Sequence, residues 1–129
     1  MKFRFPRYNR ITSSWEYDLV FRTGSRISGQ LVRLLFVKTD SEDVTRIGIV
    51  VGKKQGKSFF RNLHRRKMKE AVRRLLPHID RGYMIVLTIK REGYFSNPKE
   101  LYSDLREVAS RAGILTEGHE KLALKDDEW

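Results

Sequence analysis

Residues 46–76, RIGIVVGKKQGKSFFRNLHRRKMKEAVRRLL, contain the stretch that decides the fold. Residues 45–52 are rich in aliphatic and β-branched residues and predict a strand. A basic loop follows Gly52 over residues 53–58, and the spacing of apolar residues then predicts a long helix over residues 58–76. Pro77 ends this helix because proline has no amide hydrogen to donate to the preceding turn.

The helix predicted over residues 58–76 has two unlike faces. On a helical wheel, the apolar face consists of Phe60, Met68, Ala71, Val72 and Leu75. The opposite face consists of Asn62, Arg65, Arg66, Lys69 and Arg73. We therefore expect the helix to pack its apolar face on a sheet and to present a row of cations outward.

The positive charge of the chain is concentrated in this same stretch. Residues 52–74 contain ten lysines and arginines and one acid, Glu70, so they carry +9 of the +11 formal charge of the 129-residue chain. A solvated helix face usually mixes Glu with Lys, and this face does not. A row of cations can neutralise successive phosphates, and arginine can hold a phosphate with two hydrogen bonds. The sequence therefore predicts a nucleic-acid contact.

The rest of the chain supplies a small sheet and two more helices. Strands are expected over residues 30–38 and 83–89, the second of them central, and the polar residues 39–44 indicate a hairpin between the strands at 30–38 and 45–52. Helices are expected over residues 15–22 and 98–112. The order is αββαβα, which predicts an α+β fold, a two-layer α/β sandwich with one layer of helices on the sheet.

The two ends of the chain differ in charge. Residues 1–112 are expected to form a single RNA-binding domain that begins with a basic, loosely structured arm over residues 1–11. In this arm, aromatic residues alternate with basic ones, and both RNA contact and simple disorder stay open for it. Residues 113–129 are rich in acids and are expected to form a loose tail.

Composition excludes several classes of site. The chain has no cysteine, which excludes disulfides, thiolate chemistry and cysteine-based zinc sites. No apolar run approaches the roughly 18 to 20 residues needed to cross a bilayer. The basic N-terminus also lacks the apolar stretch of a signal peptide. We therefore expect a cytoplasmic protein without a membrane partner.

No pattern in the sequence predicts a catalytic or metal site on the protein itself. The three histidines, at positions 64, 78 and 119, have no partner at metal-ligand spacing. General acid–base work by His64 is conceivable beside the basic face, but it would need a second titrating group, and none is clearly placed. The acidic residues Asp40, Glu42 and Asp43 are expected to lie in a solvated loop.

The order of residues in the quoted stretch resembles the signature of the bacterial ribonuclease P protein family. In that family a strand with Arg-x-Gly leads into Lys-Lys-x-Gly-Lys, and an Arg-Asn pair opens a basic helix. The matching residues are Arg46, Gly48, Lys53, Lys54, Gly56, Lys57, Arg61, Asn62, Arg65, Arg66, Lys69 and Glu70. Upstream, Tyr17, Val20, Phe21 and Gly24 match a second family pattern.

The resemblance implies a protein subunit without catalytic residues, in a ribonucleoprotein whose catalytic RNA matures the 5′ end of precursor tRNA. Tyr17 and Phe21 would stack on the unpaired 5′ leader, although core packing stays open for both. Mg²⁺ would be held mainly by the RNA partner. The implied RNA-binding residues are Arg46, Lys53, Lys54, Lys57, Arg61, Asn62, Arg65, Arg66, Lys69 and Arg73. The family also implies a left-handed βαβ crossover around the basic helix.

Departures from the family pattern fall at the start of the basic helix. Leu63 and His64 stand where the family usually has an arginine and an apolar residue, and Phe59 and Phe60 are bulkier than the usual aliphatic pair. Leu63 is expected to be exposed. Two other functions stay open: a ribosomal or other structural RNA-binding protein of similar fold, and a nuclease that needs no RNA subunit.

Overall fold

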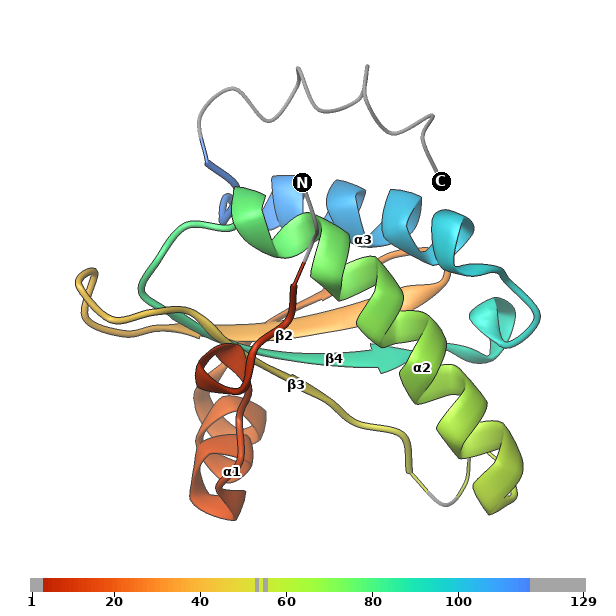
Figure 1. The fold of residues 1–129 in the computed structure, drawn as a ribbon. Coiled ribbons are helices and arrows are strands. Elements are labelled where there is room, and N and C mark those ends of the chain that lie inside the picture. Colours follow the sequence, from red (N-terminus) through yellow and green to blue (C-terminus); the bar gives the residue numbers. More distant parts are fainter. Residues whose placement is uncertain (1–3, 53, 55, 117–129) are drawn as a thin grey trace.

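A four-stranded sheet forms the centre of the molecule in the computed structural model, which describes residues 4–52, 54 and 56–116 (Figure 1). The strands are β1 (Ser25–Ser28), β2 (Val32–Lys38), β3 (Arg46–Ile49) and β4 (Tyr83–Ile89). Their order in the sheet is β1-β2-β4-β3. β2 is antiparallel to both of its neighbours, and β3 is parallel to β4.

Three helices surround this sheet: α1 (Ser14–Thr23), α2 (Ser58–Leu75) and α3 (Pro98–Ala112). Short 3-10 turns, η1 (Arg7–Asn9), η3 (Leu76–His78) and η4 (Arg91–Gly93), connect the larger elements. α3 begins at a capping box between Asn97 and Glu100, and it ends at Gly113, which adopts a left-handed conformation. α2 passes directly into the 3-10 turn that contains Pro77.

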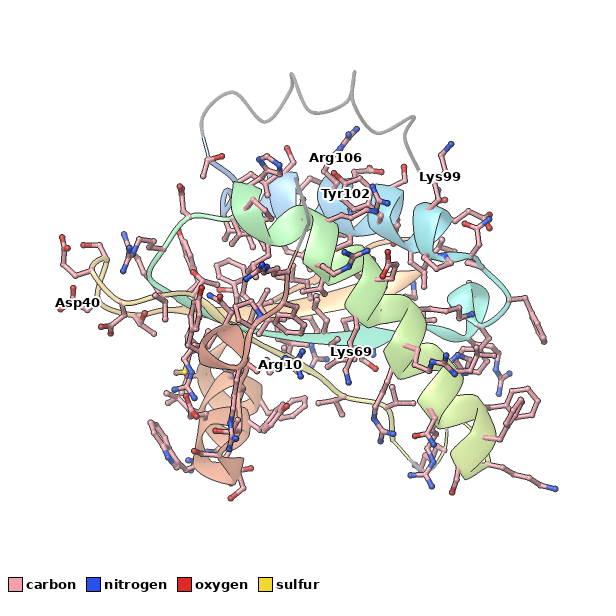
Figure 2. The ribbon with its side chains drawn as sticks, in the orientation of Figure 1. Arg10, Asp40, Lys69, Lys99, Tyr102 and Arg106 are labelled. Atoms are coloured by element: carbon pink, nitrogen blue, oxygen red, sulfur yellow. The ribbon has the colours of Figure 1, made fainter. Side chains whose placement is uncertain are left out.

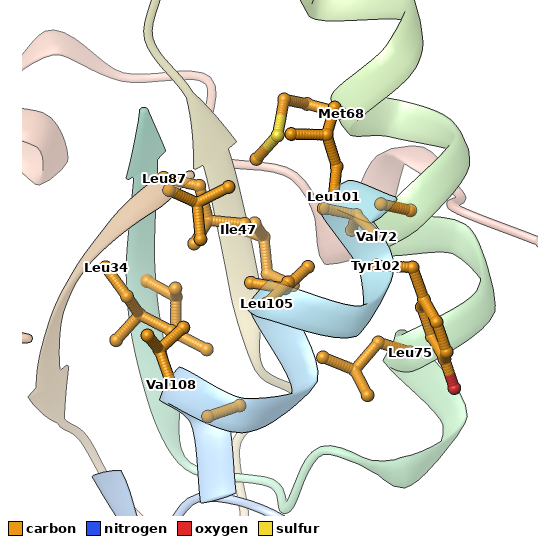
Figure 3. Close-up of a cluster of buried hydrophobic side chains, with 14 of the residues drawn as sticks. Leu34, Ile47, Met68, Val72, Leu75, Leu87, Leu101, Tyr102, Leu105 and Val108 are labelled. Atoms are coloured by element: carbon orange, nitrogen blue, oxygen red, sulfur yellow. The ribbon is translucent and has the colours of Figure 1, made fainter. Parts of the chain in front are cut away.

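The main core lies between the sheet and the helices α2 and α3, which cover the same face (Figures 1 and 3). Alternate strand residues point into it, among them Leu34, Ile85 and Leu87. The helices contribute Met68, Ala71, Val72, Leu75, Leu101, Leu105, Val108 and Ala109. These side chains are almost fully buried. Burial of each of the larger ones stabilises the fold by roughly 1.5–3 kcal/mol. The predicted apolar face of α2 is the one that packs on the sheet, with Phe60 as its exception.

The other face of the sheet carries α1 and a second, smaller core. Val20 of α1 packs there with Leu35, Met84, Val86 and Ile11. β4 is apolar on both sides, which is typical of a strand buried on both faces. Helices therefore lie on both sides of the sheet, which differs from the single helical layer expected from the sequence.

The α+β class is confirmed, with two differences in the strands. The chain has an extra strand, β1, whose polar residues Ser25–Ser28 gave no strand signal. In addition, β2 and β3 do not form the expected hairpin, because β4 lies between them. The loop after β2 instead bonds to the turn before β4, where the amide of Thr39 donates to the carbonyl of Gly82 at 2.7 Å.

Two segments expected to be loose are packed where the structure describes them. In the N-terminal arm, Phe5 belongs to the main core, Ile11 is buried, and Arg10 forms a β-bridge with Ile47. At the other end, Ile114 and Leu115 are buried against the core. Both segments carry apolar residues among their charges, and these residues seal the core. Residues 1–3 and 117–129, the rest of the predicted arm and tail, lie outside the described residues.

The predicted crossover around α2 is present as a parallel unit, in which the chain leaves β3, forms α2 and returns as β4 beside β3. The left-handed sense implied by the family resemblance stays a prediction. Among the residues that the structure describes, no helix is both long enough and apolar enough to cross a membrane.

Candidate nucleic-acid interface

The outward face of α2 carries the predicted row of cations. Asn62, Arg66 and Lys69 are exposed, and Arg65 is half-buried. The buried side of the same helix consists of His64, Met68, Ala71, Val72 and Leu75. Figure 2 shows Lys69 on the side of α2 that faces the β3 edge of the sheet, the edge to which Arg10 is also bound.

Three of these cations keep their charge available. Arg65 donates a hydrogen bond to the amide oxygen of Asn62 at 2.9 Å, which is a neutral partner. Within residues 4–52, 54 and 56–116, none of Arg65, Arg66 and Lys69 forms an ion pair with a carboxylate. A cation without a carboxylate partner can neutralise an external phosphate without first breaking an internal bond. This part of α2 is therefore suited to a polyanion.

The C-terminal half of α2 is partly neutralised. Glu70 forms an ion pair with Arg73 and lies 3.9 Å from the guanidinium of Arg74. All three side chains are partly exposed, so the pairs add little to stability. Their effect is to lower the positive potential at this end of the helix, and Arg73 is bound to an internal acid as well as being a predicted RNA contact.

Arg46 has a structural role that its position in the signature did not predict. Its guanidinium forms an ion pair with Glu16 of α1 at 2.5 Å and donates to the carbonyl oxygen of Arg10 at 3.3 Å. Glu16 is almost fully buried, so its carboxylate needs this cation. Arg46 thus joins α1 and the N-terminal arm to β3. Contact between Arg46 and RNA stays a prediction.

Gly48, the second residue of the Arg-x-Gly pattern, makes room for Tyr17. A β-carbon at position 48 would lie 2.4 Å from a ring carbon of Tyr17, a distance that no packing tolerates. The Tyr17 hydroxyl donates to the carbonyl oxygen of Ile11 at 3.5 Å. Burial raises the pKa of Tyr17, and the neighbouring charge of Glu16 raises it further. The ring therefore stays a neutral, half-buried platform on the sheet.

Phe21, one turn after Tyr17 on α1, is far more open. Its exposed fraction is 47%, which is high for a phenylalanine and leaves much of the ring available. The structure therefore places Tyr17 partly in the smaller core and Phe21 mainly at the surface. Of the two predicted leader contacts, Phe21 is the better stacking surface.

A hollow of about 550 Å³ lies at the open end of the sheet, where β4 meets the loop before α2. Its lining includes Arg33, Lys54 and Lys90, and Lys54 is one of the predicted RNA contacts. Lys90 is oriented by a 2.9 Å hydrogen bond to the carbonyl oxygen of Gly29. Arg33 and Lys90 were not predicted from the sequence to lie beside Lys54. Strand alternation was the available signal: Arg33 is two residues before Leu35, and Lys90 is two residues after Thr88, so both belong to the face of the sheet that carries α1.

The remaining predicted contacts surround the start of α2. Lys54 and Lys57 are exposed, and Arg61 donates to the hydroxyl of Ser58 at 3.1 Å. Lys53 lies outside the described residues. The exposed cations of the loop thus continue the row on α2 toward its N-terminal end.

His64 is buried inside this region. Its ring stacks on Tyr94 with 4.6 Å between the ring centroids, and burial lowers its pKa, with a further decrease from the charge of Lys67. A neutral imidazole with an exposed fraction of only 2% is unsuited to proton transfer with a substrate. In the part of the chain that the structure describes, no group of three or more His, Asp or Glu residues is placed to hold a metal ion.

Comparison with known proteins identifies the family. A sequence model of the family described as Ribonuclease P matches residues 5–113. The chain belongs to the ribonuclease P protein family. The ribonuclease P protein component of Symbiobacterium thermophilum is 33% identical over 107 residues, which is 82% of this chain and 92% of that protein. The one from a Pseudanabaena species is 32% identical over 111 residues, which is 85% of this chain and 96% of that protein.

Solved structures of the ribonuclease P family have the same fold. The Staphylococcus aureus protein superposes with a TM-score of 0.73 at 19% identity, covering 84% of this chain and 98% of its own. The Thermotoga maritima protein superposes with a TM-score of 0.70 at 26% identity, covering 79% of this chain and 96% of its own. The ribonuclease P family match ends at Gly113, the glycine that closes α3, so it covers both cores except for Ile114 and Leu115 of the main core.

Proposed function

We propose that the chain is the RNA-binding protein subunit of ribonuclease P, acting in the cytoplasm, and that it assists 5′-end maturation of precursor tRNA. One observation carries the proposal. In a chain of this family, Arg65, Arg66 and Lys69 lie on the outward face of α2 without carboxylate partners among the described residues. This row binds phosphates of the catalytic RNA.

The 5′ leader of precursor tRNA binds on the other side of the sheet, beside α1. Phe21 stacks on an unpaired base, and Tyr17 forms part of the floor. Arg33 and Lys90 neutralise leader phosphates at the open end of the sheet, where the hollow of about 550 Å³ lies. Stacking on flat rings requires no particular base, which suits a subunit that serves many precursors.

The protein supplies binding and charge neutralisation, and the catalytic RNA supplies the reaction. When bound by RNA phosphates, Mg²⁺ activates the attacking water and stabilises the leaving oxygen. The cations of α2 and its preceding loop reduce the repulsion between two RNAs that must approach closely. The protein is therefore expected to matter most when Mg²⁺ is scarce.

Reconstitution tests this function. The purified, nuclease-treated protein is combined with the catalytic RNA of its own organism, and cleavage of precursor tRNA is measured over a range of Mg²⁺ concentrations. We expect the protein to lower the Mg²⁺ concentration that cleavage requires and to be inactive alone. Cleavage that is unchanged by the protein would refute the proposal. Activity of the protein alone would point to a nuclease without an RNA subunit.

The leader contact has its own test. Phe21→Ala should weaken holoenzyme affinity for precursor tRNA but not for mature tRNA, which has no leader. Loss of one stacked base corresponds to roughly 5-fold or more. Trp15→Ala, which removes another exposed ring of α1, serves as the control. Equal losses for precursor and mature tRNA would exclude a leader contact at Phe21.

A further inference from the structure

Large apolar side chains are exposed around the start of α2. The exposed fractions are 72% for Phe59, 47% for Phe60, 38% for Leu63 and 96% for Phe95. Exposed aromatic clusters of this kind mark binding surfaces more often than chance. Neither the row of cations on α2 nor the leader contact on α1 uses these residues.

Three of these side chains surround a hollow of about 290 Å³, which we call the apolar hollow. Its walls are Phe60, Leu63, His64, Tyr94 and Phe95, and Lys54 lies beside them. α2 supplies one wall and the loop after β4 supplies the other. This volume lies at the small end of the range for ligand pockets, which suits a single flat ring system.

The two walls of the apolar hollow are fixed to one another. Lys67 of α2 donates to the carbonyl oxygens of Tyr94 and Ser96, at 2.7 and 2.9 Å. The rings of His64 and Tyr94 stack with an angle of 24° between their planes. Because the walls are already in place, a ligand would lose little free energy in ordering them.

The charge around the apolar hollow favours an RNA as its occupant. From Lys54 to Lys69 the chain has no acid, and Arg66 lies one turn beyond Leu63 on the same helix. An apolar floor among cations matches an unpaired nucleobase, whose flat ring stacks while its phosphates meet the cations. The cations beside the hollow continue into the row on α2, which favours the catalytic RNA over the leader.

The departures from the family pattern fall at the same place. Leu63 stands where the family usually has an arginine, and Phe60 belongs to a pair that is usually aliphatic. Leu63 replaces a charge with an apolar side chain, and Phe60 replaces an aliphatic side chain with a bulkier aromatic one; both line the apolar hollow. They are compatible with one phosphate contact having been replaced by a stacking contact.

From these observations we infer that the apolar hollow receives an unpaired nucleobase of the catalytic RNA. The inference rests on the proposed function, since it adds a contact to the same RNA partner. The base stacks against Phe60 and Phe95, and Lys54 neutralises an adjoining phosphate.

The test measures the affinity of the protein for the catalytic RNA of its own organism, without substrate, over a range of salt concentrations. Phe60→Ala and Phe95→Ala should each weaken binding by about 5- to 100-fold, the range expected for one stacked base. The salt dependence should stay unchanged, because no charge is lost. Trp15→Ala is the control, since this exposed ring of α1 does not line the hollow, and it should leave affinity for the catalytic RNA unchanged.

Each alternative result has a definite meaning. Unchanged affinity in Phe60→Ala and Phe95→Ala, beside a wild type that binds the RNA well, would overturn the inference and leave the proposed function intact. A loss of affinity for precursor tRNA alone would assign the hollow to the substrate and would overturn the inference. Self-association of the free protein that is abolished by either substitution would also overturn it. If the wild type does not bind the catalytic RNA, the proposed function itself fails.

Discussion

Arg46 and Arg66 show that two cations of one sequence signature can have different roles. Arg46 neutralises the buried carboxylate of Glu16, while Arg66 is exposed and has no carboxylate partner in the described part of the chain. A sequence pattern assigns both to RNA because it contains only residue types. The distinction depends on Glu16, which lies 30 positions away in the chain and cannot be paired with Arg46 from spacing alone.

Removing charge from the exposed row should reduce the electrostatic part of RNA binding. We expect Arg65→Ala combined with Arg66→Ala to weaken binding to every RNA sequence. The slope of log affinity against log salt should become shallower by about one unit per lost phosphate contact. Filter binding at several salt concentrations measures this slope. Lys99 on α3 is remote from the row, so Lys99→Ala is the control (Figure 2). An equal change of slope in this control would indicate a non-specific charge effect.

His64 should make stability depend on pH. Burial and then Lys67 lower the pKa of His64 in the folded protein, whereas an unfolded histidine titrates near about 6.5. The unfolded chain therefore takes up a proton first as the pH falls. The free energy of unfolding should have its full value above about pH 6.5 and should decrease from there down to the folded-state pKa.

Urea denaturation between pH 8 and pH 5 measures this dependence. His64→Phe keeps a ring against Tyr94 and removes the titrating group, so its free energy of unfolding should fall less over the same interval. Wild type and variant should be compared first at pH 8, where the imidazole is neutral in both states. A variant with the same pH dependence as the wild type would show that His64 does not cause it.

At the scale of elements, the ion pair between Arg46 and Glu16 joins α1 to β3 beside their apolar contact. Arg46→Ala would leave the Glu16 carboxylate buried without its cation, at a cost of about 2 kcal/mol in the free energy of unfolding. Chemical denaturation measures this decrease in the free energy of unfolding. Arg26→Ala, which removes an exposed cation of the neighbouring β1, should change stability by less than about 0.5 kcal/mol. A small effect for Arg46→Ala would contradict the role of Arg46 as the counter-ion of the buried Glu16.

Elements with local signals could be predicted from the sequence, and elements defined by distant partners could not. α3 was predicted to the residue, because Asn97, Pro98 and Gly113 mark its ends. β4 was also predicted to the residue from its apolar run. β1 was missed because Ser25–Ser28 is short and polar and is a strand only through its pairing with β2. The hairpin was wrong because β2 pairs with β4, about 50 residues later in the chain.

In the candidate site, too, features with a local sequence signal could be predicted, and features that depend on distant partners could not. The cationic face of α2 follows from helical periodicity, so sequence analysis found it. The apolar hollow combines Phe60 and Leu63 with Tyr94 and Phe95, and no local pattern joins these two segments. The expected exposure of Leu63 was confirmed. Its proximity to Tyr94 and Phe95 across the hollow could be seen only in the folded structure.

At the scale of the whole molecule, the N-terminal arm completes the core instead of extending from it. Phe5 packs among residues of the sheet and of α2 and α3. We expect Phe5→Ala to lower the free energy of unfolding by about 3 kcal/mol, as for other buried aromatic residues. Thermal and urea denaturation measure this loss. Tyr8→Ala, at an exposed ring of the same arm, should cost less than about 0.5 kcal/mol. Equal stability of the two variants would contradict a packed arm.

The pairing of this arm with β3 has a consequence for solubility. β3 is the last strand of its side of the sheet, and an uncovered edge strand offers free amide and carbonyl groups to strands of other molecules. Here the amide of Ile11 donates to the carbonyl oxygen of Ile47 at 3.1 Å, and the side-chain amide of Asn9 donates to the backbone carbonyl oxygen of Thr45 at 2.8 Å. Residues 9–11 thus cover the edge at which copies of the protein would otherwise aggregate.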